Sequence, residues 1–435
     1  MEFLLSPLGI FGLIAVNGWI LVASRSLRLT LWSLSFPLFI STLGKYRYIK
    51  ASYVVPLNYA EEFSRPMFIV LLTVLVITSL LNRSIRSQLT PERSACLFFA
   101  FQIHFSLLMI LNGVENGLLS TPVYAMSFVA MMFVLKATRE ASGKRFLLES
   151  LVLGGVLFTG GCMYQLLLAP HNAVWAGRFI GITNNSVHTA QFLALFITPT
   201  VYLTSTTIQN VFLRNALWLC IAVQFALLAY TGSRTGILMT LLPLVVMYRQ
   251  RSRHLMTAGV AFSVALLLTV VLFPEAEGAR TRLTSTEDTR SAVYQILWQQ
   301  FLDSPVFGDV DTFYYQGVKR LRVRENSYLM VAATMGFVGI AIFGAFLVTV
   351  CKAMQKLYSY PNPTGRPQFR DFVLASLVSI LAGAFFEGFL FAIVGPCYLL
   401  LYLYASMAED LAREPLPRDS RIPARPLLSQ AVLSA

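Results

Sequence analysis

The residues best suited to chemistry stand where an arginine-rich polar segment meets a long apolar run over 326–350. Arg324, Glu325, Asn326 and Tyr328 lie together there. A carboxylate at a helix start can act as a general base toward a hydroxyl group, or it can simply complement the helix dipole. Nearby arginines favour the ionised form of Glu325 and partial burial favours the protonated form, so the sequence leaves both roles open.

Arg234 is a second candidate, in the short turn 231–236 between two apolar runs. The two glycines of this turn let the backbone approach a ligand closely, and Ser233 or Thr235 can cap the helix that follows. Free N–H groups at a helix start, together with a guanidinium group, suit a phosphate. The alternative is an interfacial arginine that contacts lipid headgroups, and this motif alone does not decide between them.

Arg178 belongs to a third polar segment, a glycine-rich stretch that ends in Asn184 and Asn185. Side-chain amides can hydrogen-bond a hydroxyl-rich ligand. Turn formation and capping of the helix expected from His188 explain these residues more simply, and taken alone this explanation is preferred.

Segment 274–325 is the one large polar stretch between apolar runs, and it carries seven cations that call for anionic compensation. Acidic residues of the same segment can supply it, and so can a diphosphate or an anionic headgroup bound near its end. Within the segment, apolar residues at helical spacing predict an amphipathic helix from Arg290 to Asp303, followed by a turn at Gly308. The seven cations are Arg280, Arg282, Arg290, Lys319, Arg320, Arg322 and Arg324.

The elements that position these residues are apolar helices. The chain has 435 residues, of which 56% are hydrophobic and 13% charged, whereas soluble domains carry about 25% charged residues. The prediction is an all-α polytopic membrane helix bundle of about 12–13 spans, since roughly 20 apolar residues cross a bilayer. It forms one domain over 1–408, with a disordered cytoplasmic tail at 409–435. The runs lie at 3–23, 28–42, 66–81, 95–111, 118–135, 146–169, 188–205, 215–231, 235–248, 254–273, 326–350 and 371–408, the last long enough for two helices broken near Glu387.

The net charge of +13 is explained by topology rather than by nucleic-acid binding. Numbered in order, the odd gaps between spans hold 17 Lys and Arg residues, and the short even gaps hold six. Positive residues concentrate on the cytoplasmic side of a membrane, so the odd gaps are predicted to be cytoplasmic. Segment 274–325 is then extracytoplasmic.

Several kinds of chemistry are not indicated. The five cysteines are scattered without redox or metal-ligand spacing, and no Walker loop, zinc-protease or nucleophile-elbow motif occurs. The sequence therefore predicts no metal and no cofactor. A transporter or flippase would place charged residues in the middle of the bilayer; the main residue of this kind is Glu387, which can equally stand in an outer turn. A non-enzymatic assembly protein would tolerate the loss of Arg234.

Taken in order, these motifs resemble the superfamily of O-antigen ligases and O-antigen polymerases, over about residues 175–345. The resemblance is carried by Gly177-Arg178-Phe179 with Asn184-Asn185, by the turn 231–236, by Arg290–Trp298 with Pro305 and Gly308, and by Asn326-Ser327-Tyr328-Leu329 with Gly336 and Gly339. Ligases of this superfamily typically have a histidine, regarded as essential, at the position of Glu325.

The resemblance implies a metal-independent membrane glycosyltransferase of the bacterial inner membrane, with its active site on the extracytoplasmic face. It would transfer a glycan from an undecaprenyl-diphosphate-linked donor to a glycan or lipid acceptor. Arg178, Arg234 and Arg290 would bind the diphosphate, with further anion contacts from Arg320, Arg322 and Arg324. Glu325 would be catalytic, and Asn184, Asn185, Asn326 and Tyr328 would shape the site. Glutamate in place of histidine favours a polymerase, with a ligase that attaches glycan to lipid A core as the alternative.

Overall fold

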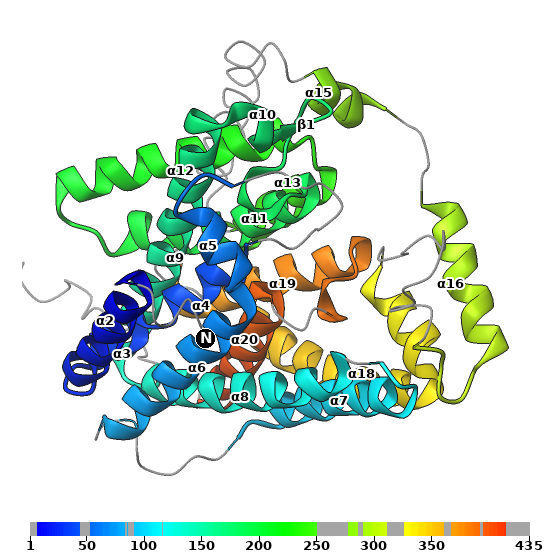
Figure 1. Cartoon of the computed structure of the whole chain (residues 1–435). Helices are drawn as coiled ribbons and strands as arrows, with labels where there is room; N and C mark the ends of the chain where they lie inside the picture. The colour runs from blue at the N-terminus through cyan, green and yellow to red at the C-terminus, as the bar shows by residue number, and fades with distance from the viewer. Residues whose placement is uncertain are drawn as a thin grey trace, which may run out of the picture.

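A computed structural model describes most of the chain, and Figure 1 shows its arrangement. Four candidate residues, Arg320, Arg322, Arg324 and Glu325, lie outside the described part, as do the run 254–273 and the tail from 415. The described residues are 7–43, 53–82, 85, 91–114, 116–249, 277–285, 290–310, 326–360, 367–391 and 395–414.

The described chain is almost entirely helical, in agreement with the predicted all-α class. The only sheet in this part is a two-residue antiparallel hairpin of β1 (Val174–Trp175) and β2 (Arg178–Phe179). The helices up to the hairpin are α2 (Pro7–Ala23), α3 (Leu27–Trp32), α4 (Ser35–Ile40), α5 (Leu57–Glu62), α6 (Ser64–Leu81), α7 (Arg93–Leu111), α8 (Asn116–Ala137), α9 (Ala141–Leu168) and α10 (Pro170–Ala173). Those after it are η1 (Gly181–Thr183), α11 (Ser186–Thr206), α12 (Val211–Thr231), α13 (Arg234–Met247), α15 (Glu277–Thr284), α16 (Ser291–Asp303), α18 (Ser327–Ser359), α19 (Phe369–Phe386), η2 (Phe389–Phe391) and α20 (Pro396–Arg413).

Seven helices within the described residues are long and apolar enough to cross a membrane: α6, α7, α8, α9, α12, α18 and α19. Each has at least 18 residues, a length of about 27 Å or more at 1.5 Å per residue. This agrees with the thickness of a hydrocarbon core, about 30 Å. The chain is therefore built as a polytopic membrane helix bundle.

Two helices, α11 and α20, form the interior of this bundle (Figure 1). Both are buried along nearly their whole length. α11 packs against α9, α12, α13 and α19, and α20 packs against α7, α8, α18 and α19. An apolar run shows that a helix avoids water, but not whether lipid or protein surrounds the helix. The neighbouring helices show that protein surrounds α11 and α20.

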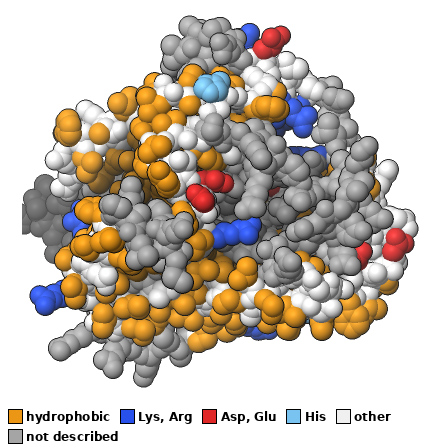
Figure 2. Space-filling model, in the orientation of Figure 1, with side chains coloured by type: hydrophobic (Ala, Val, Ile, Leu, Met, Phe, Trp, Pro, Cys, Tyr) orange, Lys and Arg blue, Asp and Glu red, His pale blue; other side chains and the backbone are white. Residues whose placement is uncertain are grey.

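The outer helices carry the surface expected to face lipid. Phe11 of α2, Leu111 of α7 and Phe212 of α12 are all highly exposed. Figure 2 shows hydrophobic side chains along the lower part of the molecule, where Figure 1 places α6, α7 and α8. Extended apolar surface of this kind is rare on soluble monomers and typical of membrane contact.

The predicted amphipathic helix is present as α16, and the turn after it is fitted onto a break in α18. Gly336 interrupts α18 with φ 58°, and Phe337 N–H donates to the carbonyl of Pro305 at 2.8 Å. Gly308 has φ +72°, and a Cβ there would lie 2.2 Å from the Thr334 carbonyl carbon. Only glycine satisfies both the left-handed backbone and this close approach. The contact fixes α16, and with it Arg290 at its start.

The end of the last helix differs from that expected. The run 371–408 is divided into α19 and α20 as predicted, with Glu387 directly after α19. However, α20 extends past residue 408 to Arg413, because polar residues of its last turn form ion pairs. Arg413 bonds to both Glu92 and Glu409. Of segment 274–325, the structure describes α15, α16 and their flanking residues.

Candidate functional site

The site is centred on the turn between α12 and α13. Gly232 ends α12 in the left-handed conformation with φ 62°, and the Ser233 side chain caps α13 by accepting from Gly236 N–H at 3.2 Å. A Cβ on Gly232 would lie 2.7 Å from the Cα of Ala279. α15 therefore lies directly on this turn, as close as glycine permits.

Arg178 contacts the turn from the β1–β2 hairpin. Its Nε donates to the carbonyl oxygen of Thr231 at 2.8 Å. Burial lowers the pKa of Arg178, and the nearby Arg282 lowers it further, while Glu387 acts in the opposite direction. Arginine nonetheless stays protonated at neutral pH. A largely buried cation next to a second cation is the environment that an anionic ligand would relieve.

Arg290, directly before α16, contacts the same turn. Its Nη2 lies 3.3 Å from the Thr235 hydroxyl and 3.3 Å from Oε1 of Glu387. The guanidinium carbon lies 5.3 Å from the ring centroid of Phe386. The Arg290 and Glu387 side chains are 27% and 13% exposed, so the pair is partly shielded from water and stronger than a surface ion pair.

Arg234, within the turn itself, holds α15 in place. Its Nε and Nη2 donate to the carbonyl oxygen of Arg282 at 3.1 and 2.7 Å, and Nη2 also bonds to the carbonyl of Ser285. Carbonyls at a helix C-terminus favour a cation. These hydrogen bonds make Arg234 a support for the α15 wall of the site, a position that its spacing in the sequence did not indicate.

A cavity of about 590 Å³ opens between the hairpin and α15. Two cations line it, Arg178 and Arg282, together with the hydroxyl of Thr281 and the carboxylate of Glu277. Gly278 lets the walls meet, since a Cβ there would lie 1.9 Å from the carbonyl oxygen of Ala176. The cavity thus offers guanidinium and hydroxyl groups to a polar, anionic ligand.

The two asparagines after the hairpin differ in role. Asn185 caps α11, with its Oδ1 accepting from Val187 N–H at 2.8 Å and from His188 N–H at 3.2 Å. The preferred explanation, helix capping, is therefore confirmed for Asn185. Asn184 adopts φ 57° and is buried, and its Oδ1 has no hydrogen-bond partner among the described residues. An unpaired buried acceptor is costly, so Asn184, unlike Asn185, keeps an acceptor that no described residue satisfies.

The start of α18 is hydrogen-bonded to the end of α19 and to Glu387, which follows it. Asn326 caps α18 by accepting from Tyr328 and Leu329 N–H, and Tyr328 donates to the carbonyl oxygen of Leu381 at 2.8 Å. Ser327 donates to the carbonyl oxygen of Glu387 at 2.6 Å. The chain just after Glu325 is thus linked to the backbone of Glu387, the residue whose carboxylate pairs with Arg290.

Three of the predicted arginines therefore meet around one turn, although they come from segments more than 50 residues apart. The residue that sequence reasoning undervalued is Glu387, considered there only as a transporter signal or an outer turn. Its one visible signal was a charge beside a glycine inside an apolar run. Among the described residues, no three His, Cys, Asp or Glu side chains lie close enough to hold a metal ion.

Compared with protein-family models and with curated protein sequences, the chain matches none significantly.

Proposed function

We propose that this protein transfers a glycan from a polyprenyl-diphosphate-linked donor to a hydroxyl acceptor at the extracytoplasmic surface of a bacterial inner membrane. One observation carries the proposal: Arg178 and Arg290, from two distant segments, both contact the turn 231–236 that contains Arg234, beside a cavity lined by Arg178 and Arg282. Paired phosphates are the ligand that such a group of arginines suits best.

The proposed reaction needs little besides charge stabilisation and orientation. The bond between the anomeric carbon and the diphosphate oxygen breaks, and the acceptor oxygen forms a new bond to that carbon. The acceptor proton passes to a base, and the diphosphate leaves with its electron pair. Arginines fixed beforehand stabilise the charge that develops on the leaving group.

Each residue has a part in this proposal. Arg178 and Arg282 contact the diphosphate in the cavity, and Arg234 supports the α15 wall while contributing charge. Arg290, held by Glu387, adds a further cation next to the turn. Glu325 is proposed as the base, Asn184 as an acceptor for a sugar hydroxyl, and Asn326 and Tyr328 as residues that shape the site. Further anion contacts would come from Arg320, Arg322 and Arg324.

The proposed topology follows from the charge distribution of the chain. About 12–13 spans form one domain. Segment 274–325 lies on the extracytoplasmic side together with the arginine cluster, which is the set Arg178, Arg234 and Arg290. The polyprenyl tail of the donor would lie in the bilayer against the exposed apolar helices. Glu387 supports an enzyme over a flippase, because it stands at the end of α19 in an ion pair rather than alone inside a span.

Polymerisation is the preferred form of the reaction, with another lipid-linked repeat unit as acceptor. It rests on Glu325, which occupies the position where the ligases of the resembled superfamily have histidine. Attachment to lipid A core or another acceptor is the alternative, and it differs only in the molecule that supplies the hydroxyl.

The test is a reconstituted assay in vesicles that contain undecaprenyl-diphosphate-linked repeat units, with glycan length read on gels. Wild type should produce long chains without added metal, and Glu325→Gln should not. Arg65→Gln, an exposed arginine at the start of α6, serves as the control and should match wild type. Normal chain length in Glu325→Gln would remove Glu325 from the mechanism. Failure of wild type to extend any lipid-linked glycan would contradict the proposed function.

A further inference from the structure

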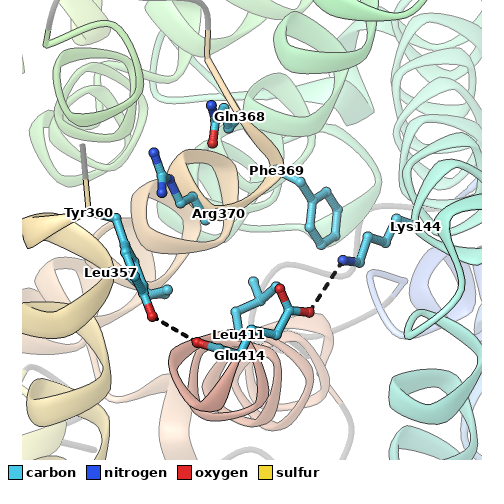
Figure 3. A pocket seen from close by; sticks show the side chains of 8 residues that line it. All are labelled: Lys144, Leu357, Tyr360, Gln368, Phe369, Arg370, Leu411 and Glu414. Carbon is cyan, nitrogen blue, oxygen red and sulfur yellow. Dashed lines mark hydrogen bonds and ion pairs between the residues drawn. The ribbon is translucent and has the colours of Figure 1, made fainter. Parts of the chain in front are cut away.

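A second cavity, of about 270 Å³, lies at the other end of the bundle (Figure 3). α18 and α20 end there, and α9 and α19 begin there. α19 has 18 residues, so it spans about 27 Å, and its far end leads into Glu387. The cavity and the arginine cluster are therefore separated by about the thickness of a hydrocarbon core. In a membrane they lie at opposite surfaces.

Two cations from different helices line this second cavity. Arg370 lies with its guanidinium carbon 5.3 Å from the ring centroid of Tyr360, and Lys144 Nζ lies 5.6 Å from that of Phe369. Aromatic faces attract cations and hold them in place. Figure 3 shows these side chains around one open space, with Leu411 on its lower side.

Among the described residues that line the cavity, Lys144 and Arg370 are cations and Glu414 is an anion. Lys144 Nζ is 3.9 Å from Oε1 of Glu414, a loose pair whose carboxylate is 62% exposed; such contacts are worth little. Asp371, in the first turn of α19, pairs with Arg249 at 3.2 Å and caps the helix by accepting from Gln368 N–H at 2.9 Å. The described lining therefore carries more positive than negative charge.

We propose that this cavity binds the phosphate headgroup of an anionic phospholipid from the leaflet opposite the arginine cluster. Lys144 and Arg370 contact the phosphate, while Phe369 and Leu411 contact the apolar glycerol end. Basic pockets between helix ends at a membrane surface suit such headgroups. Free phosphate would use the cations but gain nothing from the apolar residues. This proposal depends on the chain lying in a membrane and not on glycan transfer.

The experiment measures phosphatidylglycerol binding to the full-length protein in detergent by native mass spectrometry, with phosphatidylcholine and inorganic phosphate as comparison probes. Wild type should retain phosphatidylglycerol in preference to both. The double variant Lys144→Gln/Arg370→Gln should bind it roughly tenfold or more weakly, because each cation near a headgroup contributes about 1 kcal/mol. The control Lys352→Gln/Lys356→Gln removes the same charge from the exposed face of α18 nearby and should bind as wild type does.

An equal loss of phosphatidylglycerol binding in both double variants would indicate general electrostatic attraction and overturn the proposed site. No loss of binding in either double variant would also overturn it. Competition by inorganic phosphate at similar concentration would assign the cavity to a free anion instead. A photoactivatable phosphatidylglycerol bound to wild type gives a readout that does not depend on how the variants fold. It should label peptides that contain residues 357–370 or 411–414; labelling elsewhere alone would contradict the proposal.

Discussion

At the scale of single residues, the proposed function depends on cations that are held in place before a ligand binds. Arg178 is fixed by the carbonyl of Thr231 and stands near Arg282 in a cavity wall. Burial and the neighbouring positive charge both disfavour the charged form of its guanidinium group. Holding this cation in place therefore costs part of the folding free energy. Such an arrangement is expected where an anion binds.

Replacing Arg178 by lysine should reduce glycan extension roughly ten- to hundredfold, as expected when a charge-assisted hydrogen bond of about 1.5–3 kcal/mol is lost. Lysine keeps the charge but loses the planar, bidentate donor geometry. The initial rate of extension at limiting donor measures the effect, with Arg65→Lys as control. Full activity in Arg178→Lys would show that charge alone suffices at this position.

The ion pair between Arg290 and Glu387 allows a sharper test by exchange. Arg290→Glu and Glu387→Arg should each lower stability by about 1–3 kcal/mol, because each leaves like charges facing one another in a partly buried site. The double exchange should recover most of the melting temperature but little of the activity, because the cation then stands at position 387 instead of position 290. Recovery of activity together with stability would reduce this pair to a structural role.

The sequence predicts that Arg178, Arg234 and Arg290 come together, but it does not predict what holds them. Arg178 and Arg234 are charges in short polar segments between apolar runs, and Arg290 belongs to the large polar segment 274–325. In the structure Arg178 and Arg290 both contact the turn that contains Arg234. That Glu387 pairs with Arg290 could not be predicted, because the two are 97 residues apart and the pairing depends on how α16 and α19 pack. Likewise, no sequence pattern indicates that Arg234 bonds to the end of α15.

At the scale of elements, the contact between the turn after α16 and the break in α18 determines where Arg290 stands. Gly308→Ala should lower stability by about 2–4 kcal/mol, because alanine pays for the left-handed backbone and also meets the backbone of Thr334. Activity should fall with it. Thermal unfolding in detergent measures the first effect.

The matched control is Gly344→Ala in the same helix α18, where an added Cβ meets nothing within 4 Å. It should leave stability unchanged or raise it by up to about 1 kcal/mol, because alanine favours a helix. If both alanine variants had the same melting temperature, the contact between Gly308 and Thr334 would not be what holds α16.

Elements with a strong pattern are the ones that the sequence predicts. α16 follows the helical spacing from Arg290 to Phe301, and α19 and α20 separate near Glu387 as expected. The β1–β2 hairpin was not predicted, because two-residue strands show no alternation. The break at Gly336 was not predicted either, since the residues around it are apolar throughout and the reason for it lies in the distant turn at Pro305.

At the scale of the whole molecule, helices far apart in the sequence are joined by a charge network at the ends of α7, α8 and α20. Glu92 is buried there and accepts from Arg139 at 3.0 Å. It also pairs with Arg413, while Glu409 and Asp410 lie nearby. Burial, the largest effect, raises the pKa of Glu92 above its ordinary value of 4.5, although the two arginines oppose this.

This shift predicts a pH dependence with a definite sign. A carboxyl whose pKa is raised by folding binds its proton more tightly in the folded state. Its contribution to stability is present below pH 4.5 and is lost as the pH rises through the folded-state pKa. The melting temperature of Glu92→Gln, relative to that of wild type, should therefore increase from acidic to neutral pH. A constant difference across this range would show that Glu92 does not titrate in this way.

The polytopic class could be predicted from composition alone, but the arrangement of the helices could not. Hydropathy marks α11 in the same way as the lipid-facing helices, yet its neighbours bury it. Which helices are interior depends on packing among segments distant in sequence. A run of apolar residues does not indicate how such segments pack.

Binding of undecaprenyl diphosphate to the purified protein, compared with binding of undecaprenyl monophosphate, tests the role of Arg178 and Arg290. We expect a clear preference for the diphosphate in wild type and in Arg65→Gln. We expect that preference to be lost in Arg178→Gln and Arg290→Gln, with each variant still folded. Equal affinity for the two lipids in wild type, or an unchanged preference in both arginine variants, would contradict the claim that the arginines around turn 231–236 bind a lipid-linked diphosphate.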